Sequence, residues 1–477
     1  MSLFRTLPAL ALALSLGAAP CFAAPLVTPF QQAVAQAASE DEAIAAFYRD
    51  RDFAPIWMGA EADGAAHRRA AFLWALDAAD DHGLPTGRYD AGTIRAEFAA
   101  ADSAAARGAL EVEMTRRFLR YAQDVSSGVL DPTRIDRTIV VEVPKRDWLE
   151  QITAFTDGDP YAFVQGLWPT SPAYTRLLRE KLRLEEMRAA GGWGAEVPGG
   201  KLRPGDDGRA VVALRNRLIR MGYLRRSAVA TYDSTMEAAV RAFQTDHGLT
   251  PDGEAGASTL SAVNVELEDR IAQIVIGLER QRWMNKALED RHILVNLAEQ
   301  HAYVVDHGKV TFDTVVVVGS ESPGRRTPEF SHTMTHMVIN PTWNVPRSIT
   351  VNEYLPALRR GGARHLEVYS SRGRVNRGSI DFSRYTARNF PYSLKQPPGP
   401  RNALGRVKFM FPNKWNIYLH DTPSKDLFGR DLRTFSHGCV RVGRPFDLAY
   451  HLLEPQSVDP EEEFTSILNT GRERRVN

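Results

Sequence analysis

The stretch His292–Gly319, "HILVNLAEQHAYVVDHGKVTFDTVVVVG", sets the fold of the C-terminal part of the chain. Its apolar residues alternate with polar ones, which is the period of a strand with one buried face. The apolar runs are Ile293, Val295 and Leu297, then Tyr303 and Val305, then Val310 to Val318. His307-Gly308 separates the last two runs as a tight turn. The stretch therefore predicts an antiparallel β meander.

"TMTHMVINPTWNVP" at 333–346 predicts a further strand, so we expect a mainly-β domain over residues 290–450. An insertion over 346–397 interrupts the strand pattern and contains nine arginines. Insertions of this length tend to be lids or binding loops, so we predict a capping insertion. The alternative is a solvated surface whose arginines pair with backbone and scattered acids. Residues 451–477 are expected to be a C-terminal tail.

Helical periodicity dominates the first half of the chain. In residues 24–200, Leu110, Met114, Phe118 and Tyr121 form one apolar stripe, and Ser171-Pro172 is a helix start. Residues 206–264 predict a compact unit of three helices, with Val212, Leu214, Leu218, Ala239, Val240 and Phe243 inward. Residues 265–289 predict a connecting helix. The expected fold class is therefore multidomain α+β, with a helical scaffold domain ahead of the β domain.

Composition narrows the class of protein. The chain has 477 residues, 43% hydrophobic and 25% charged, with a formal net charge of +1. These values fit several globular domains and argue against an electrostatic nucleic-acid binder.

The first residues, 1–23, resemble a signal peptide with cleavage after Ala23. An uncleaved anchor is the alternative, and Pro20 argues against lipidation of Cys21. We expect export to the periplasm and no stable membrane insertion after cleavage.

After that cleavage Cys439 is the only cysteine of the chain, and it lies in "FSHGCVRVG" at 435–443. A thiol has a pKa near 8.5, so a nucleophilic cysteine needs a base. His437 is close in sequence, but His420 follows a separate apolar run and its geometry can be set independently, which makes it the better base. Gly438 favours a sharp turn whose N–H groups could face an oxyanion. Arg441 shares the strand parity of Cys439 and could bind a carboxylate.

Three other readings of this motif stay open. Free cysteine is often an inert buried residue. His420, His437 and Cys439 could ligate zinc, although no fourth ligand is obvious. Ser436 could be the nucleophile, with a histidine as its base.

His420, a gap of 15 residues and "SHGCVR" at Ser436–Arg441 resemble the signature of L,D-transpeptidases. Residues 206–264 resemble a peptidoglycan-binding module, and the order of parts resembles the large Gram-negative periplasmic members. The resemblance implies Cys439 as nucleophile, His420 as base and the Asp421 carbonyl as its orienting group. It also implies an oxyanion hole from the N–H groups of Gly438 and Cys439. Ser436, His437, Arg441 and Trp343 are the implied supporting or substrate-contacting residues.

The resemblance further implies a reaction. Cys439 would cleave the bond between the diamino acid and the terminal D-Ala of a stem tetrapeptide, and the thioester would form a 3→3 cross-link. The arginines of the insertion would hold stem carboxylates. Peptidoglycan stem peptides and glycan are the expected partners, with cell-wall synthesis proteins as further candidates; no cofactor or metal is expected. The alternatives are an L,D-carboxypeptidase, an enzyme that anchors proteins to the wall, and a non-catalytic peptidoglycan-binding scaffold.

Overall fold

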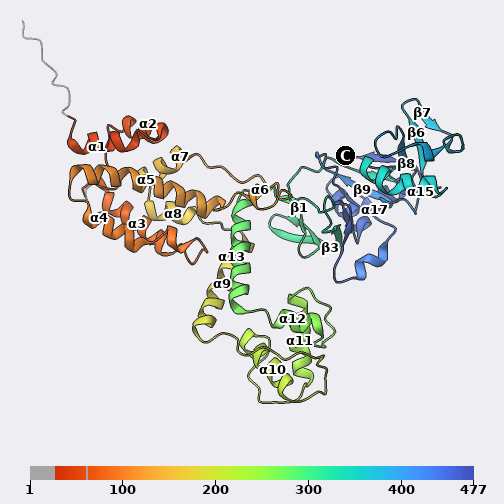
Figure 1. The fold of residues 1–477 in the computed structure, drawn as a ribbon, viewed down its shortest axis with the longest axis horizontal. Coiled ribbons are helices and arrows are strands. Elements are labelled where there is room, and N and C mark those ends of the chain that lie inside the picture. The colour runs from red at the N-terminus through yellow and green to blue at the C-terminus, as the bar shows by residue number, and fades with distance from the viewer. Residues whose placement is uncertain (1–26, 61–62) are drawn as a thin grey trace, which may run out of the picture. The chain divides into compact units, whose positions relative to one another are not determined.

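The computed structural model describes residues 27–60 and 63–477, so the expected signal peptide and Cys21 lie outside the described residues. The chain forms two compact units (Figure 1). Of the described residues, the first contains 27–60, 63–80, 85–122 and 146–167, and the second contains 81–84, 123–145 and 168–477. All strands assigned in the described chain belong to the second unit. Within the described ranges, none of the helices combines the length and apolarity that crossing a bilayer requires.

The first unit is helical. Its helices are α1 Pro29–Ala38, α2 Glu42–Asp50, α3 Ala65–Asp77, α4 Ala91–Ala100, most of α5 Ala104–Ser127, α7 Trp148–Asp157 and α8 Pro160–Gly166, with a 3₁₀ turn at Thr86–Arg88. The predicted stripe of α5 is buried, and Phe118 packs on Phe155 with ring centroids 4.2 Å apart. The buried carboxylate of Glu111 accepts backbone N–H groups of Ile56 and Met58, which fixes the loop before α3 against α5.

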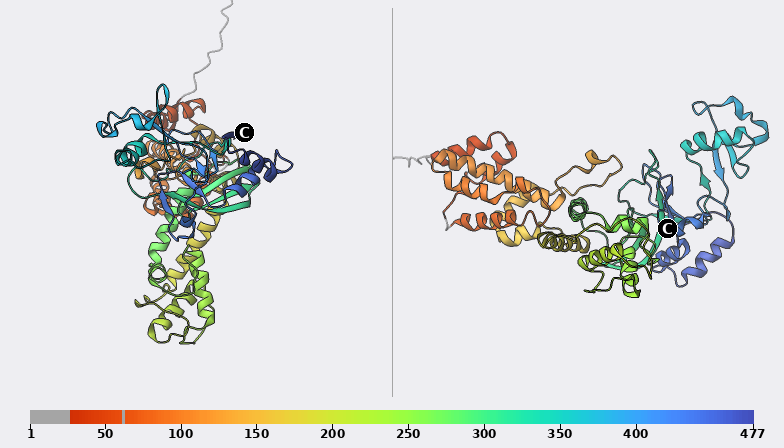
Figure 2. Two further views of the ribbon diagram at one scale, coloured as in Figure 1. Left: turned by 90° about the vertical axis from the view of Figure 1, so that its right-hand side faces the viewer. Right: turned by 60° about the horizontal axis from the view of Figure 1, so that its bottom comes forward.

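Three helices of the second unit precede its β-sheets in the chain and lie outside its three-helix segment, 206–264. These are α6 Pro132–Ile135, α9 Pro172–Ala189 and α13 Leu267–Trp283. Ser171 caps α9 by accepting the N–H of Tyr174, with Pro172 at the first helical position, as the sequence predicted. Helix α13 runs beside α9 in both views (Figures 1 and 2). The guanidinium of Arg282 lies 5.8 Å from the centre of the Tyr174 ring and joins the two helices.

The segment 206–264, which resembles a peptidoglycan-binding module, is a three-helix unit within this second part. Its helices are α10 Arg209–Met221, α11 Ser234–Asp246 and α12 Ala257–Val263. Five of the predicted inward residues are buried, namely Leu214, Leu218, Ala239, Val240 and Phe243. Val211 is fully buried in place of Val212, because the core-facing stripe of α10 also includes Leu214 and Leu218. Gly222 ends α10 with a φ of +93°, a conformation that glycine adopts without strain.

The predicted meander is confirmed as β1 Arg291–Asn296, β2 His301–Asp306 and β3 Lys309–Gly319, paired antiparallel. In β2, however, Ala302 and Val304 are buried, whereas Tyr303 and Val305 are not. The expectation for this strand was wrong: the small Ala302 and Val304 form its buried face, and Tyr303 lies on the other face. A register shift follows Val304, and it leaves the extra residue, Thr311, on β3. The 9-stranded sheet has the order β1-β2-β3-β12-β10-β9-β4-β13, and β11 pairs with β3. Its other strands are β4 His336–Ile339, β9 Val407–Met410, β10 Leu419–His420, β11 Thr434–Ser436, β12 Val440–Val442 and β13 Arg474–Val476.

One face of this sheet is apolar and is covered by α16 Pro445–Leu453 and α17 Pro460–Asn469. Phe409, Leu419 and Val440 lie in this core, and so does Phe464 of α17. The segment 451–477 is therefore not merely the predicted C-terminal tail, because it supplies core residues and the last strand, β13. Its helical stripe of Phe464, Ile467 and Leu468 is the pattern that favours this packing.

The insertion folds as a small cap with its own core. Its 4-stranded sheet has the order β5-β8-β6-β7, from β5 Trp343–Asn344, β6 Glu367–Ser370, β7 Gly373–Val375 and β8 Ser393–Gln396. The cap also contains α14 Arg347–Ile349, a π-helical turn at Thr350–Tyr354, α15 Leu355–Arg359 and 3₁₀ turns at Arg377–Ser379 and Phe382–Arg384. A further 3₁₀ turn, Lys425–Gly429, lies between β10 and β11. Leu355, Val368 and Leu394 are buried in the core of the cap, so it is a folded subdomain rather than an open loop.

Candidate active site

Cys439 lies in a tight turn between β11 and β12. The hydroxyl of Ser436 donates to the carbonyl of Cys439 at 2.5 Å and accepts the N–H of Gly438 at 3.0 Å. From a neighbouring segment, Thr327 Oγ1 donates to the carbonyl of Gly438 at 2.7 Å. Gly438 has a φ of +114°, and a Cβ there would stand 2.9 Å from Ile417 Cδ1. The turn therefore requires glycine, and hydrogen bonds hold it on both sides.

The sulfur of Cys439 is half-buried and faces two groups of the preceding strand region. It donates to the carbonyl of Asn416 over 3.6 Å, and the hydroxyl of Tyr418 hydrogen-bonds to it. Burial raises the pKa of the Cys439 thiol to about 11, although the bond from Tyr418 and the charge of Arg441 oppose that rise. At neutral pH the resting site therefore holds a thiol rather than a thiolate.

His420 ends β10 and is buried, with 5% of its surface exposed. Its Nδ1 lies 2.5 Å from the carbonyl oxygen of Asp421. Since a carbonyl only accepts, Nδ1 carries the hydrogen and Nε2 keeps the lone pair. Burial lowers the pKa of His420 to about 4, and the charge of Arg441 adds to this effect. The imidazole is thus neutral at neutral pH and oriented to accept a proton.

Asp421 is fixed by its side chain as well. Its carboxylate accepts the backbone N–H groups of Arg406 and Thr422 at 2.8 and 2.7 Å and the ammonium of Lys425 at 2.6 Å. Gly405 makes room for it, because a Cβ at that position would stand 2.2 Å from Asp421 Oδ2. The group that orients His420 is therefore held by three bonds of its own.

Strand register brings the two halves of the motif together. Strands β10 and β12 pair in parallel, with Leu419 opposite Val440 and His420 opposite Arg441. Leu419 and Val440 face the apolar core, so His420 and Arg441 face the opposite side of the sheet. In the described chain no hydrogen bond links the ring of His420 to the sulfur of Cys439, which is common in substrate-free sites.

His437 points away from this pair and contacts the cap. Its Nε2 lies 2.6 Å from Oε1 of Glu353, which belongs to the π-helical turn of the cap. Arg325 bonds the same carboxylate oxygen at 2.9 Å. His437 is consequently placed to link the catalytic turn to the cap rather than to serve as a base.

Three expectations are corrected by this geometry. The N–H of Gly438 is occupied by Ser436, so in this state it is not a free oxyanion donor. Trp343 is 7% exposed and packs on Tyr354 in the core of the cap, so we assign it to that core and not to substrate contact.

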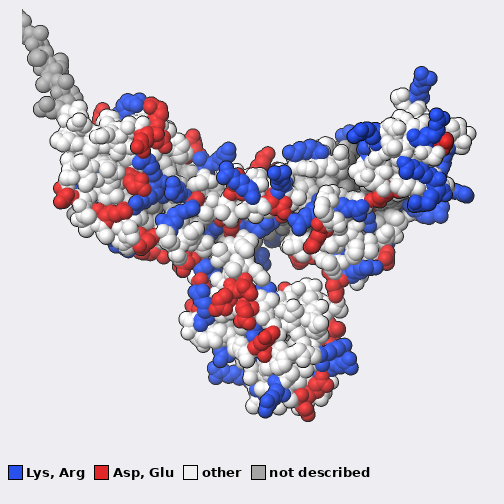
Figure 3. Space-filling model, in the orientation of Figure 1, with Lys and Arg blue, Asp and Glu red and all other residues white. Residues whose placement is uncertain are grey.

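The third correction concerns the arginines of the cap. Arg347, Arg359 and Arg377 donate to backbone carbonyls within the cap, and Arg374 pairs with Glu367. Arg360, Arg364, Arg372, Arg384 and Arg388 are exposed. Lys and Arg side chains predominate over this part of the surface (Figure 3). Part of the positive charge therefore stabilises the fold of the cap, and only the exposed remainder is available to stem carboxylates.

Sequence reasoning missed Tyr418 and Glu353. Tyr418 lies two residues before His420 and shares its strand parity, so alternation along Tyr418–His420 could have identified it. Glu353 had no such signal, because the cap brings it to the catalytic turn only through tertiary structure. For the zinc hypothesis, the described residues offer no group of three convergent His, Cys, Asp or Glu side chains.

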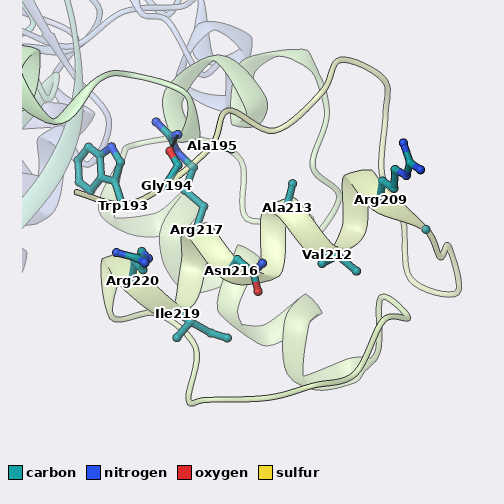
Figure 4. A pocket seen from close by; sticks show the side chains of 11 residues that line it. Trp193, Gly194, Ala195, Arg209, Val212, Ala213, Asn216, Arg217, Ile219 and Arg220 are labelled. Atoms are coloured by element: carbon teal, nitrogen blue, oxygen red, sulfur yellow. Dashed lines mark hydrogen bonds between the residues drawn. The ribbon is translucent and has the colours of Figure 1, made fainter. Parts of the chain in front are cut away.

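The three-helix unit at 206–264 has a surface groove of about 760 Å³ along α10 (Figure 4). Its apolar lining includes Val212, Ala213 and Ile219, and Trp193 lies at one end. Arg209 lies at the other end of the view, and its side chain is exposed. Such a surface suits an extended ligand with an apolar face and oxygen acceptors.

Family models match three parts of the chain. Residues 290–458 match the L,D-transpeptidase catalytic domain, residues 42–182 match a scaffold domain, and residues 207–263 match a "Putative peptidoglycan binding domain". A "Putative L,D-transpeptidase" of Haemophilus influenzae is 34% identical over 176 residues. That alignment covers 35% of this chain and 35% of the relative, so the chain spans about a third of the relative's length.

Two solved structures also resemble the chain in part. The L,D-transpeptidase of Xylanimonas cellulosilytica has 18% identity over 52% of this chain and 87% of its own, with a TM-score of 0.15. The Ldtfm–avibactam carbamoyl enzyme has 16% identity over 51% and 85%, with a TM-score of 0.17. These TM-scores are too low to support a structural argument.

Proposed function

We propose that the protein is a cysteine acyltransferase of the cell wall, since residues 290–458 match the model of the L,D-transpeptidase catalytic domain. Its donor is a peptidoglycan stem tetrapeptide, cleaved between the third residue, a diamino acid, and the terminal D-Ala. Its acceptor is the side-chain amine of another stem, which gives a 3→3 cross-link. The observation that carries this proposal is the neutral, oriented His420 on the strand beside Cys439.

In the first step, Cys439 Sγ attacks the carbonyl carbon of the third residue while its proton moves to Nε2 of His420. A thiol of pKa about 11 and an imidazole of pKa about 4 exchange no proton at rest, so the transfer accompanies the attack. Bond formation removes the developing charge from sulfur. The Tyr418 hydroxyl and Arg441 are the groups that stabilise sulfur before the bond is complete.

The tetrahedral oxyanion needs donors that are free when it forms. The N–H of Cys439 is our candidate, since Ser436 occupies the N–H of Gly438. When the intermediate collapses, the C–N bond breaks and His420 gives its proton to the leaving amine of D-Ala. The acceptor amine then attacks the thioester carbonyl and passes a proton to His420. As the new amide forms, the C–S bond breaks, and His420 returns that proton to the departing sulfur, which restores the thiol of Cys439.

Two other outcomes share the same acyl-enzyme. Water as acceptor makes the protein an L,D-carboxypeptidase, and a protein amine makes it an enzyme that anchors proteins to the wall. A non-catalytic scaffold is the remaining alternative. The three-bond fixation of Asp421 favours a catalytic site over that scaffold, because a scaffold needs no oriented imidazole.

The module at 207–263 supports peptidoglycan as the partner, and we propose that the groove along α10 contacts it. An extracytoplasmic place of action follows from this substrate, with residues 1–23 as the proposed export signal. Replacing Ile219 and Arg209 by alanine should weaken co-sedimentation with sacculi but leave cleavage of a soluble tetrapeptide unchanged. Equal sedimentation of the variant and the wild type would remove the groove from the proposal.

The reaction is tested by muropeptide analysis after sacculi are incubated with the wild type or with Cys439→Ala. The proposal predicts new 3→3 dimers with the wild type and none with the variant. Tripeptide monomers without dimers would identify a carboxypeptidase. Identical products from both proteins would refute the cysteine mechanism.

A further inference from the structure

The sheet face that carries His420 also carries a lysine that the proposed mechanism does not use, Lys408 of β9. Lys408 lies opposite His420 across the β9–β10 pair, and Arg441 lies opposite His420 across the β10–β12 pair. The three side chains therefore form one row over three adjacent strands. Neighbours in such a row have Cβ atoms about 5 Å apart, so their charges interact directly.

Strand parity fixes the side on which this row lies. Phe409, Leu419 and Val440 are the residues next along each strand, and all three are buried in the apolar core. Lys408, His420 and Arg441 consequently point to the opposite face, which also carries Tyr418. The ammonium of Lys408 lies 5.8 Å from the centre of the Tyr418 ring, so it extends toward the site.

The two cations of this row lack a counterion. Neither Lys408 nor Arg441 forms an ion pair or side-chain hydrogen bond within the part of the chain that the structure describes, although both are half-buried. Glu473 acts on Lys408 only from a distance, and its carboxylate accepts the N–H of Thr342 at 2.5 Å. Burial lowers the pKa of both cations. Keeping two unpaired cations beside a buried histidine is costly, and an anionic ligand would offset that cost.

We propose that Lys408 and Arg441 together form a subsite for a carboxylate of the donor stem peptide, which makes Lys408 a specificity-determining residue. This inference rests on the proposed function. A donor tetrapeptide offers two carboxylates near the scissile bond: that of the terminal D-Ala, and that of the third residue when its side chain carries one. Both present the same chemistry to an ammonium and a guanidinium.

The test uses the full chain and four synthetic tetrapeptides with 2,6-diaminopimelate as the third residue. The first peptide has both carboxylates free, and the second has both converted to amides. In the third only the side-chain carboxylate of the third residue is an amide, and in the fourth only the carboxylate of D-Ala is. Release of D-Ala or its amide gives kcat/KM for the wild type, Lys408→Met and Lys408→Arg. Lys309→Met is the matched control, because Lys309 is exposed at the start of β3. Binding of the same peptides to Cys439→Ala, with and without Lys408→Met, is measured by calorimetry.

We expect the wild type to favour the acid over the amide by about tenfold or more at one of the two positions, the size of a charge-assisted hydrogen bond. That position identifies the carboxylate. Lys408→Met should abolish the preference by slowing the acid donor alone, and Lys408→Arg should retain much of it. An unchanged preference, or an equal loss for all four donors, would overturn the subsite. If the wild type releases nothing, the proposed function fails, and the calorimetric acid-to-amide ratio still decides on the subsite.

Discussion

Nε2 of His437 lies 2.6 Å from Oε1 of Glu353, so the turn that carries Cys439 is bonded directly to the cap. Arg325 shares the same carboxylate at 2.9 Å. The three side chains are partly exposed, so the contact contributes little to stability. Its effect should instead be on the placement of the cap over the catalytic turn.

Replacing Glu353 by glutamine should therefore lower kcat/KM for a tetrapeptide by about three- to tenfold, mainly through KM, with an unchanged melting temperature. The reason is that a neutral amide holds His437 and Arg325 less tightly than a carboxylate does. Steady-state kinetics of D-Ala release measure the effect. Glu367→Gln is the matched control, because Glu367 pairs with Arg374 inside the cap. Equal effects of the two variants would mean that the contact with His437 has no special role.

Gly438→Ala should reduce the rate of acylation by about 100-fold or more. Its φ of +114° disfavours any side chain, and the new Cβ would press on Ile417, so the turn must change shape. The rate of covalent addition of a carbapenem, followed by intact mass, measures this. Gly429→Ala serves as control, since a Cβ there meets nothing within 4 Å. A Gly438→Ala enzyme that acylates at the wild-type rate would show that the geometry of the turn is not needed.

The dependence of kcat/KM on pH should follow from the burial of His420 and Cys439, both of which are neutral at neutral pH. With the pKa of His420 at about 4 and that of Cys439 at about 11, kcat/KM should be flat across neutral pH. Its acid limb should fall near pH 4. An acid limb near pH 6.5, the ordinary value for histidine, would contradict the burial of the base.

The lowered pKa of His420 should also affect the free energy of unfolding. The pKa of His420 is lower in the folded state than in the unfolded state, so protonation favours unfolding as pH falls below about 6.5. The loss should accumulate down to about pH 4 and reach the order of 3 kcal/mol. His420→Gln should lack this component. Parallel pH profiles of the melting temperature for the two proteins would contradict it.

Thr327 should act as a positioning residue for the catalytic turn. Its hydroxyl donates to the carbonyl of Gly438 and accepts the N–H of Gly319 at 2.8 Å. Thr327→Val leaves both backbone groups without this partner, so we expect kcat to fall about tenfold while KM changes little. Thr327→Ser keeps the hydroxyl but removes the methyl group. A wild-type kcat in this variant would show that the hydrogen bonds of the hydroxyl, and not the packing of the side chain, position the turn. Thr333→Val, at an exposed site, should have no effect.

Much of the catalytic domain could be predicted because local pattern and tertiary structure agree there. The alternation in His292–Gly319 reports one buried face, and the meander forms as that pattern requires. The buried face of β2 was predicted wrongly, because its larger apolar residues Tyr303 and Val305 lie opposite the face of Ala302 and Val304. The bulge at Thr311 of β3 could not be predicted either, because it depends on how β2 and β3 pair. Likewise, the core position of Phe464 depends on packing against a sheet that is distant in sequence.

In the candidate site, too, some features could be predicted from the sequence and others depend on the tertiary structure. Cys439 and His420 could be selected from residue type and spacing. The occupied N–H of Gly438, the burial of Trp343 and the bond from Glu353 depend on how separate segments meet. The row of Lys408, His420 and Arg441 is a property of strand register, which no single segment of sequence contains.

The central claim is that the sulfur of Cys439 forms a thioester with the third residue of a donor stem. The most direct measurement is the intact mass of the full chain, quenched in acid during turnover of a synthetic tetrapeptide, followed by peptide mapping. The account predicts a mass gain equal to the tripeptide acyl group on the peptide that contains Cys439, together with released D-Ala, and no gain for Cys439→Ala. An adduct that persists in Cys439→Ala, or D-Ala release without any adduct and undiminished by that substitution, would contradict it.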